Sequence, residues 1–415
     1  MQTVTSLSAY LENLQRFGIQ PGLERIHALL KSTGDPQQQH PIILVGGTNG
    51  KGSTCEFLAK RLEKDGKKVG LYTSPHLYIW NERIRVLGGG RWEVGDGQTA
   101  LFPGAISDVE LDALFADALP HIQAVADSEL GQPTEFEVLT FLGLWHFARQ
   151  KVDAAVIEVG LGGKWDATNA TEPTVSVITH VALDHCDRLG NTLEAIAGDK
   201  VEIARNGRSL VTAETKPEVL AVFEEHCAKI GCQLIKAENS QSPADFQQIN
   251  LQTAQTAYRV LCQTLSWPFN SKLKIQNSKL FVPGRFETIR ENPRVIIDGA
   301  NNPDGAQILA AQLKNALADA PESKLILVLG ILLDKDYAAM TKILAPLAHT
   351  VIATQSHSPR AAATSLVAEE ARHYCAHVEE SATPQTALER AIELAGTNDI
   401  ICVTGSFYTI SEIQR

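Results

Sequence analysis

The stretch Val45-Gly46-Gly47-Thr48-Asn49-Gly50-Lys51-Gly52-Ser53 decides how the first part of the chain folds. An apolar run, 42–45, leads into it, and a helical pattern from Ser53 to Lys64 follows it. A strand, a glycine-rich loop and a helix in this order direct backbone N–H groups and a helix N-terminus at a phosphate chain. A simple turn is the alternative, but its several glycines would lose much backbone entropy on folding. We therefore interpret the stretch as a binding site for ATP or GTP.

The loop also carries side chains suited to a nucleotide. Lys51 is expected to bring a positive charge to the β- and γ-phosphates, and the Ser53 hydroxyl is expected to bind Mg²⁺. Asn49, Gly50 and Gly52 complete the predicted nucleotide contacts. The strict P-loop pattern has serine or threonine directly after the lysine, whereas here Gly52 separates the two.

Further apolar strands are expected to end in polar side chains. Ser74 follows one of them, Glu158 lies at the end of the strand 154–160, and the pair Asp184-His185 follows the strand 175–179. Ligands of open α/β sheets bind at the carboxyl ends of strands. An ionised carboxylate in such a place is costly unless it is paired or binds a metal, so Glu158 is the candidate for a metal-coordinating acid. Asp184-His185 resembles a metal or phosphate site, whereas turn chemistry explains Ser74 equally well.

Two charged segments have a structural explanation beside a functional one. The segment Asn81–Val86 alternates like a strand and carries two arginines, for which a solvated face and anion binding both remain open. Lys200 lies on a predicted helix, 193–203, where a lone lysine is ordinarily a solvated charge.

Residues 88–107 are rich in glycine and predict an exposed loop or hairpin. Apolar residues at helical spacing predict further helices, over 6–17, 108–128, 133–147 and 246–265.

The segment 281–293, which ends in the polar stretch Arg290-Glu291-Asn292-Pro293, divides the chain into two parts. Beyond it, apolar strands alternate with helices of about ten to fifteen residues, which predicts a parallel sheet. The predicted strands there are 295–297, 325–329, 351–353 and 400–403, and the helices begin at Pro303 and Tyr337 and lie near 362–374 and 384–396. We therefore predict an α/β fold, with an ATP-binding domain that has a mainly parallel sheet, residues 1–287, and a smaller α/β domain, residues 288–415.

The composition excludes several classes of protein. The chain has 415 residues and a formal net charge of −11, which gives no support for a nucleic-acid partner. No N-terminal signal occurs, and no apolar run approaches the roughly 18 to 20 residues that span a bilayer, so no membrane partner is expected. The seven cysteines are scattered and odd in number, which argues against a complete disulfide framework. A cytoplasmic protein is predicted.

Several short motifs follow one another along the chain. They are Gly47-Thr48-Asn49-Gly50-Lys51-Gly52-Ser53, Thr73-Ser74-Pro75-His76-Leu77, Asn81-Glu82-Arg83-Ile84, Glu158-Val159-Gly160-Leu161-Gly162-Gly163, Asp184-His185 with Leu189-Gly190, Pro283-Gly284-Arg285, Asp334-Lys335-Asp336, Ser358-Pro359-Arg360-Ala361 and Thr404-Gly405-Ser406. In this order they resemble the folylpolyglutamate synthase/dihydrofolate synthase family, relatives of the Mur ligases, over nearly the whole chain. The displaced serine of the phosphate loop is this family's own form.

The resemblance implies an N-terminal P-loop ATPase domain and a smaller C-terminal Rossmann-like domain that closes over it, as in the Mur ligases. It also implies ATP and two Mg²⁺ ions as cofactors. The positions that match the family's metal-binding residues are Ser53, Ser74, Glu158 and His185. The positions that match its ATP-binding residues outside the loop are Asn250, Arg285 and Asp298.

The resemblance assigns catalytic roles to Lys51, His185 and Lys200. Lys200 matches a carbamylated lysine, which replaces the solvated-charge interpretation: a neutral amine captures CO₂ and becomes an anion that orders metal and γ-phosphate. The positions that match substrate-binding residues, most of them in pterin-binding segments, are Leu23, Glu24, Arg25, Ile26, Arg83, Thr134, Glu135, Phe136, Glu137, Lys164, Trp165 and Asp166. The chain departs from the family pattern at Lys164-Trp165, Val201-Glu202 and Asn301.

The activity implied by the resemblance is an ATP-dependent carboxylate–amine ligation of the bifunctional bacterial type, by a monomer. L-Glutamate would be joined to dihydropteroate, giving dihydrofolate, and to reduced folates, giving a γ-linked glutamate chain, through an acyl phosphate. A Mur-type peptidoglycan precursor ligase is the alternative, although the roughly 40 residues before the loop are too few for a separate N-terminal domain. A non-catalytic nucleotide switch would leave the second α/β domain unexplained.

Overall fold

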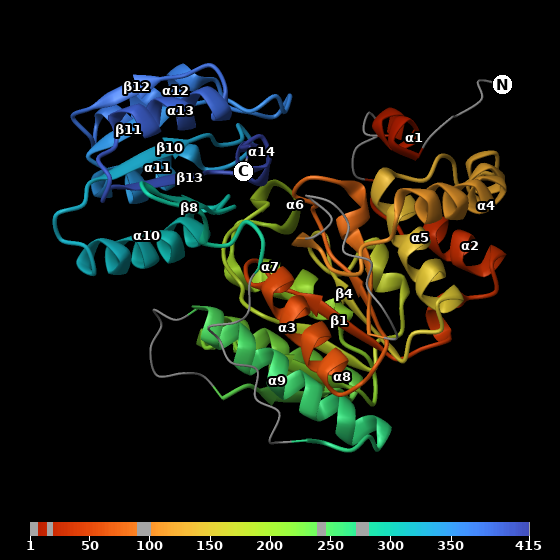
Figure 1. Ribbon diagram of the computed structural model, residues 1–415. Coiled ribbons are helices and arrows are strands. Elements are labelled where there is room, and N and C mark those ends of the chain that lie inside the picture. The colour runs from red at the N-terminus through yellow and green to blue at the C-terminus, as the bar shows by residue number, and fades with distance from the viewer. Residues whose placement is uncertain (1–6, 15–19, 89–100, 239–245, 271–281, 415) are drawn as a thin grey trace. The chain divides into compact units, whose positions relative to one another are not determined.

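The structure, a computed structural model, describes residues 7–14, 20–88, 101–238, 246–270 and 282–414. By their contacts these residues fall into two compact units, which are the described residues of 7–238 with 247–270, and Phe246 with 282–414. Each unit has helices packed against a mostly parallel sheet (Figure 1), which confirms the predicted α/β fold class. The domain boundary between residues 287 and 288 stays a prediction.

The sheet of the first unit is built around β1 (Ile42–Gly46), whose residues are all buried. Its neighbours run parallel to it and place Glu158 and Val177 on either side of Val45. Strands buried on both faces have the continuous apolar sequences that predicted them. The order in the sheet is β3 (Ile84–Leu87), β2 (Val69–Tyr72), β4 (Ala154–Glu158), β1, β5 (Val175–Ile178), β6 (Ser209–Thr212) and β7 (Gln233–Lys236), with β3 antiparallel to β2.

Helices cover both faces of this sheet. Figure 1 shows α2, α4 and α5 together on one side and α3 on the other. Gly70 in β2 allows α5 to approach, because a Cβ there would lie 2.6 Å from the ring of Phe147. The helices of the unit are α1 (Leu7–Leu14), α2 (Glu24–Ser32), α3 (Lys51–Lys64), α4 (Asp108–Ala126), α5 (Glu135–Arg149), α6 (Cys186–Leu189), α7 (Leu193–Lys200), α8 (Pro217–Ile230) and α9 (Phe246–Leu265).

The second unit repeats this architecture with a smaller sheet. Leu313, Leu344 and Val367, on three successive helices, share one core with β10 and β11. The strand order is β12 (Val378–Glu380), β11 (Thr350–Ala353), β10 (Leu325–Leu329), β13 (Ile400–Thr404), β9 (Arg294–Ile297) and β8 (Glu287–Glu291), with β8 antiparallel to β9. The helices are α10 (Pro303–Ala318), α11 (Tyr337–Leu344), α12 (Thr364–Arg372), α13 (Pro384–Leu394) and α14 (Phe407–Ser411).

The structure corrects the expected strand Asn81–Val86. Residues Trp80–Arg83 form a turn of 3-10 helix, η3, and the strand β3 begins only at Ile84. The reason is the Glu82 carboxylate, which accepts hydrogen bonds from the backbone N–H groups of Leu77, Tyr78 and Ile79 and so bends the chain back on itself. The solvated face considered for the second arginine is also wrong, because Arg85 is 2% exposed and pairs with Glu56.

Other expectations differ in smaller ways. The strands β7, β8 and β12 were not predicted, since each is an edge strand with partly exposed residues. The predicted helix 193–203 ends at Lys200 and continues as a short 3-10 helix, η6 (Val201–Ile203). Residues 15–17 of the first predicted helix and 89–100 of the glycine-rich segment lie outside the described residues. Within the described part of the chain, no helix is long and apolar enough to span a membrane.

Candidate functional site

The phosphate loop joins the carboxyl end of β1 to the first turn of α3. Gly47 and Gly50 have φ of +141° and +86°, in the left-handed region that favours glycine. A Cβ at Gly47 would overlap the hydroxyl of Thr179, and one at Gly50 would overlap the amide of Asn250. The Lys51 ammonium donates a hydrogen bond to the carbonyl of Thr48 at 3.2 Å. The loop is therefore closed against its neighbours, with the N-terminus of α3 at its end, as a phosphate site requires.

The Glu158 carboxylate lies at the carboxyl end of β4, beside this loop. It is 5% exposed and accepts a hydrogen bond from the backbone N–H of Ser74 at 2.9 Å. It also faces the first turn of α3, since a Cβ at Gly52 would lie 3.6 Å from both of its oxygens. The structure thus brings Glu158 together with Ser74 and with the turn that contains Ser53. Carboxylate and hydroxyl oxygens are hard ligands, which fit Mg²⁺.

His185 stands at the start of α6 with φ of +51°, a left-handed conformation. Its backbone N–H donates to Asp184 Oδ1 at 2.9 Å, and its Nε2 lies 3.9 Å from Asp184 Oδ2. Among the described residues no three His, Cys, Asp or Glu side chains gather as a metal site. The predicted metal set contains two serines, one glutamate and one histidine, so this absence does not test it.

Lys200 ends α7 with its side chain buried against the phosphate loop. The residue is 4% exposed, and its Nζ donates a hydrogen bond to the carbonyl of Gly47 at 3.2 Å. Burial, reinforced by the charge of Lys51, lowers the pKa of Lys200 to about 7 against the opposing effect of nearby aspartates. Gly163 allows this approach, because a Cβ there would lie within 2.9 Å of Lys200 Cα. The solvated charge considered for a lone helical lysine is therefore wrong for this residue.

The predicted pterin-binding segments contact one another, largely through internal pairs. Glu137 accepts hydrogen bonds from Arg25 Nε and from the N–H and hydroxyl of Thr134, which caps α5. Asp166 accepts from the N–H groups of Leu161 and Thr168. In the first segment, Ile26 is buried in the core, and Leu23 precedes α2, whose first turn contains Glu24. Phe136 and Asp166 both lie against Gly160. Trp165 is 51% exposed, and Lys164 Nζ lies 5.1 Å from the centre of its ring.

Arg83 lies in a polar cluster that the sequence did not fully predict. Its Nε donates to His76 Nδ1 at 3.0 Å, and its guanidinium is 3.7 Å from Glu135. The rings of His76 and Trp80 are 4.2 Å apart between their centres. Burial and the charge of Arg83 lower the pKa of His76 to about 3, so this imidazole is neutral and accepts. The motif around Ser74 contained His76, but only the fold brings Trp80 beside it.

The remaining predicted ATP contacts lie in different units. Asn250, on α9 of the first unit, is buried with its amide against Gly50. In the second unit, Asp298 accepts from the N–H groups of Phe286 and Ala300, and burial raises its pKa although the charge of Arg285 opposes this. The Arg285 guanidinium lies 4.6 Å from the centre of the Phe407 ring. Their roles in ATP binding stay predictions.

Two protein families match parts of the chain. The family described as Mur ligase middle domain matches residues 118–288, and the family described as Mur ligase, glutamate ligase domain matches residues 284–407. The first match covers β4, β5 and β6 of the first sheet, and the second covers most of the α/β unit that follows residue 282. Fold and site thus define a protein of the Mur ligase class.

The relatives narrow this class. A dihydrofolate synthase/folylpolyglutamate synthase of Bacillus subtilis is 33% identical over 98% of this chain and 97% of its own length. The structure "E.coli FolC in complex with DHPP and ADP" matches with a TM-score of 0.82 at 28% identity, over 99% of this chain and 97% of that one. A structure of a bifunctional folylpolyglutamate synthase/dihydrofolate synthase with Mn, AMPPNP and L-glutamate bound has a TM-score of 0.79 at 28% identity, over 99% and 98%.

The chain belongs to the dihydrofolate synthase/folylpolyglutamate synthase family. These relatives do not favour the Mur-type peptidoglycan alternative.

Proposed function

We propose that this protein is an ATP-dependent ligase that joins L-glutamate to dihydropteroate and to reduced folates. The observation that carries the proposal is the gathering of a phosphate loop, the buried Glu158 and the buried Lys200 at one edge of the sheet, in a chain whose relatives are folate ligases. The named complexes of those relatives with DHPP, ADP, AMPPNP, Mn and L-glutamate support the same substrates here.

In the proposed reaction the loop and Lys51 hold the phosphates of ATP. A carboxylate oxygen of the pteroate or folate attacks the γ-phosphorus, and the bond to the bridging oxygen breaks, which gives an acyl phosphate and ADP. The amino nitrogen of L-glutamate then attacks the acyl carbon, phosphate leaves, and the nitrogen gives up a proton to form the amide. Positioning and charge neutralisation supply most of the catalysis in such phosphoryl transfers.

Ser53, Ser74, Glu158 and His185 would hold Mg²⁺, proposed as two ions, which supplies charge neutralisation to the phosphates. The support is the chemistry of the donors: a buried carboxylate that already accepts the Ser74 N–H, beside a helix turn that carries a serine. Arg83, with the segments around Arg25, Phe136 and Asp166, would bind the pterin.

Lys200 is proposed to be carbamylated. Its amine nitrogen would bond to the carbon of CO₂ and lose a proton, which leaves an anionic carbamate. A lysine must be neutral to react in this way, and its lowered pKa of about 7 and its burial support a neutral amine. We also propose that the protein works as a monomer in the cytoplasm, where reduced thiols are the rule, and all seven of its cysteines are free.

The decisive assay measures ATP- and glutamate-dependent product with dihydropteroate, tetrahydrofolate and a UDP-muramyl substrate side by side. Turnover with the first two supports the proposal, turnover with the third alone would replace it with the Mur reaction, and ATP binding without any turnover would favour a nucleotide switch.

The carbamate has its own test. Lys200→Arg keeps the positive charge but cannot form a carbamate, so its ligase rate should fall by about 10²-fold or more. Lys200→Ala should be partly rescued by a short carboxylic acid that fills the vacated space. Full activity of Lys200→Arg would exclude the carbamate while leaving the ligase proposal intact.

A further inference from the structure

A segment outside the predicted site, residues 179–182, lies along the phosphate loop and is hydrogen-bonded to it. The N–H of Thr48 donates to the carbonyl of His180 at 2.6 Å. The Thr48 hydroxyl accepts from the N–H of Ala182 at 3.1 Å and lies 3.2 Å from its carbonyl oxygen. The Thr179 hydroxyl donates to the carbonyl of Asn49 at 2.7 Å. The conformation of the loop is therefore defined by a neighbouring backbone segment as well as by its own glycines.

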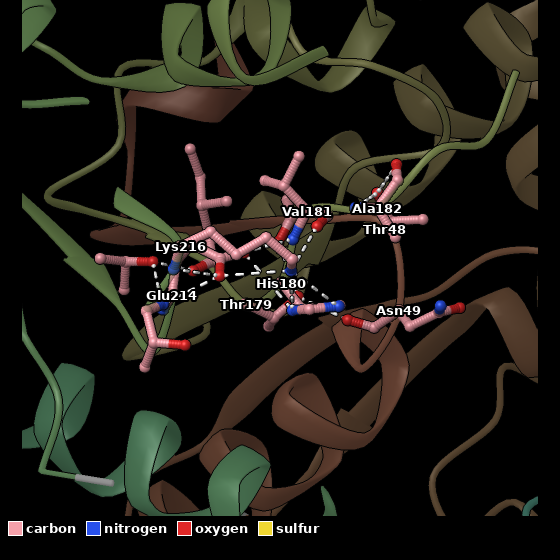
Figure 2. A network of polar contacts seen from close by, with 12 residues as sticks. Thr48, Asn49, Thr179, His180, Val181, Ala182, Glu214 and Lys216 are labelled. Atoms are coloured by element: carbon pink, nitrogen blue, oxygen red, sulfur yellow. Dashed lines mark hydrogen bonds and ion pairs between the residues drawn. The ribbon is translucent and has the colours of Figure 1, made fainter. Parts of the chain in front are cut away.

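The other side of this segment is held by two side chains from the chain after β6. The N–H of Val181 donates to Glu214 Oε2 at 2.9 Å, and the carbonyl of Val181 accepts from Lys216 Nζ at 2.9 Å (Figure 2). In an extended chain, the backbone N–H and carbonyl groups of one residue point to the side opposite to those of the next residue. His180 and Ala182 can thus bind Thr48 while Val181 binds Glu214 and Lys216.

The segment 179–182 directly follows β5 and lies beyond the last paired residues of the sheet. β5 lies between β1 and β6, with Ile178 opposite Gly46 on one side and Thr212 on the other. Beyond these pairs, the chain leaves β1 as the phosphate loop and continues into α3. On the other side, the side chains of Glu214 and Lys216 bind the backbone of Val181, as the backbone of β6 binds β5 further back. The segment 179–182 is therefore positioned by Glu214 and Lys216 where strand pairing has ended.

Glu214 is suited to this task because it is buried and ionised. It is 4% exposed, and its second oxygen accepts from the N–H groups of Thr215 and Lys216 at 2.8 and 3.1 Å. Burial alone would raise its pKa, but the hydrogen bond and charge of His180, 3.4 Å away, and the backbone N–H groups lower it to about 2. A hydrogen bond to an ionised acceptor is stronger than one between neutral groups.

We propose that Glu214, assisted by Lys216, is a positioning residue for ATP binding, which holds the phosphate loop in its nucleotide-binding conformation through Val181 and Thr48. It touches no substrate in this scheme. Its effect is preorganisation: the loop N–H groups are already directed at the phosphates before ATP arrives, so less ordering is needed on binding. This inference rests only on the nucleotide-binding part of the proposed function.

The test is the affinity of the purified full chain for a non-hydrolysable ATP analogue with Mg²⁺, measured by titration calorimetry. Glu214→Gln should raise the Kd about tenfold or more, the effect of losing a charge-assisted hydrogen bond, and should raise KM for ATP while leaving KM for L-glutamate unchanged. Lys216→Met, which removes one of the two contacts to Val181, should have a smaller effect in the same direction.

Glu56→Gln is the matched control for lost stability. Glu56 is 6% exposed, and its substitution also removes an ion pair, the one with Arg85. Among the described residues, Glu56 forms no hydrogen bond with residues 179–182. It should lower the melting temperature as Glu214→Gln does and leave the Kd unchanged. Equal rises in Kd for both variants, or an unchanged Kd in folded Glu214→Gln, would overturn the inference.

A double-mutant cycle tests the path through Thr48. Thr48→Val removes the hydroxyl that contacts Ala182, and Glu214→Gln weakens the contact to Val181. Both contacts belong to the same support of the loop, so their effects on Kd should be less than additive, whereas Thr48→Val and Glu56→Gln should be additive. Additive effects in both cycles would show that Glu214 does not act through Thr48. If the unmodified protein bound no nucleotide at all, the proposed function would fail instead.

Discussion

The carboxyl edges of the two sheets carry different chemistry on the same architecture. Both sheets are parallel apart from one antiparallel edge strand. At the edge of the first sheet, Glu158 and Lys200 are ionisable side chains that are 5% and 4% exposed. At the edge of the second, the buried Asp298 follows β9, and Thr354, Ser356 and Thr404 bring uncharged hydroxyls that are buried and, among the described residues, have no hydrogen-bond partner.

The two edges differ in the energetic cost of the groups that they bury. A buried charge is costly unless it is paired, and an isolated buried hydroxyl costs less. The first edge concentrates that cost around one loop, where burial and the charge of Lys51 lower the pKa of Lys200 and where Glu158 faces a helix N-terminus. Strongly perturbed groups in one place are typical of a catalytic site. We therefore expect substitutions of Glu158 and Lys200 to change activity, and substitutions of the three hydroxyl residues Thr354, Ser356 and Thr404 to change mainly stability.

Glu158→Gln should give the largest effect. A neutral amide is a poor ligand for Mg²⁺, so the ligase rate should fall by at least the roughly 10- to 100-fold that loss of outer-shell metal partners costs. The measurement is the ligase rate across a Mg²⁺ titration. The Mg²⁺ concentration for half-maximal rate should also rise, and a titration identical to that of the unmodified protein would return Glu158 to a structural role.

Lys200→Met should make the protein more stable, although it removes a proposed catalytic residue. The pKa of Lys200 falls from its ordinary value of 10.5 to about 7 on folding, so burial opposes folding while the amine is protonated. The penalty is full below pH 7 and disappears as the pH rises from 7 towards 10.5. Free energies of unfolding, measured without Mg²⁺ and CO₂, should favour the variant by on the order of a few kcal/mol at pH 6.

That gain should shrink steadily as the pH approaches 10, because the folded lysine is then neutral at no cost. Effects of other titrating groups are common to both proteins and cancel in the difference. A gain of the same size at pH 6 and pH 10 would mean that the methionine merely packs better and that the lysine is not held neutral.

The sequence predicted the parts of this edge that break a local pattern. Glu158 ends an apolar run, and the glycines of the phosphate loop follow another, so the sequence alone was enough to predict both. The burial of Lys200 could not be predicted from the local sequence, because helix 193–200 has few apolar residues. Only the family resemblance identified Lys200 as a candidate site residue. The edge strands β7 and β12 were missed for a related reason: their residues are partly exposed and lack the alternation or apolar run that marks a strand.

Glu214 and Lys216 show a different limit. They lie in the polar stretch Glu214-Thr215-Lys216-Pro217-Glu218, for which no structure or role was predicted and in which α8 begins at Pro217. Their contacts to Val181 join segments more than thirty residues apart, and these arise only because β5 and β6 are neighbours in the sheet. Pairing between strands is not encoded in any local pattern.

The smallest expected effect compares one threonine at each edge. Thr212, at the end of β6, is fully buried; its hydroxyl donates to the carbonyl of Ile178 at 2.8 Å and accepts from the N–H of Glu214 at 3.1 Å. Thr354 follows β11 and is equally buried, but its hydroxyl lacks a partner among the described residues. Valine has almost the same shape as threonine, so replacement by valine removes only the hydroxyl.

Thr212→Val should therefore destabilise the protein by about 1–3 kcal/mol, because it leaves a buried carbonyl and a buried N–H without that partner. Thr354→Val should instead stabilise it by about 1 kcal/mol, because a polar group that is desolvated without compensation is removed. Denaturant unfolding of both variants at one pH measures the two differences. Opposite signs would support the contrast between the edges. Destabilisation by both variants to the same degree would mean that the Thr354 hydroxyl is satisfied after all, by water for example, and that the second edge is as fully paired as the first.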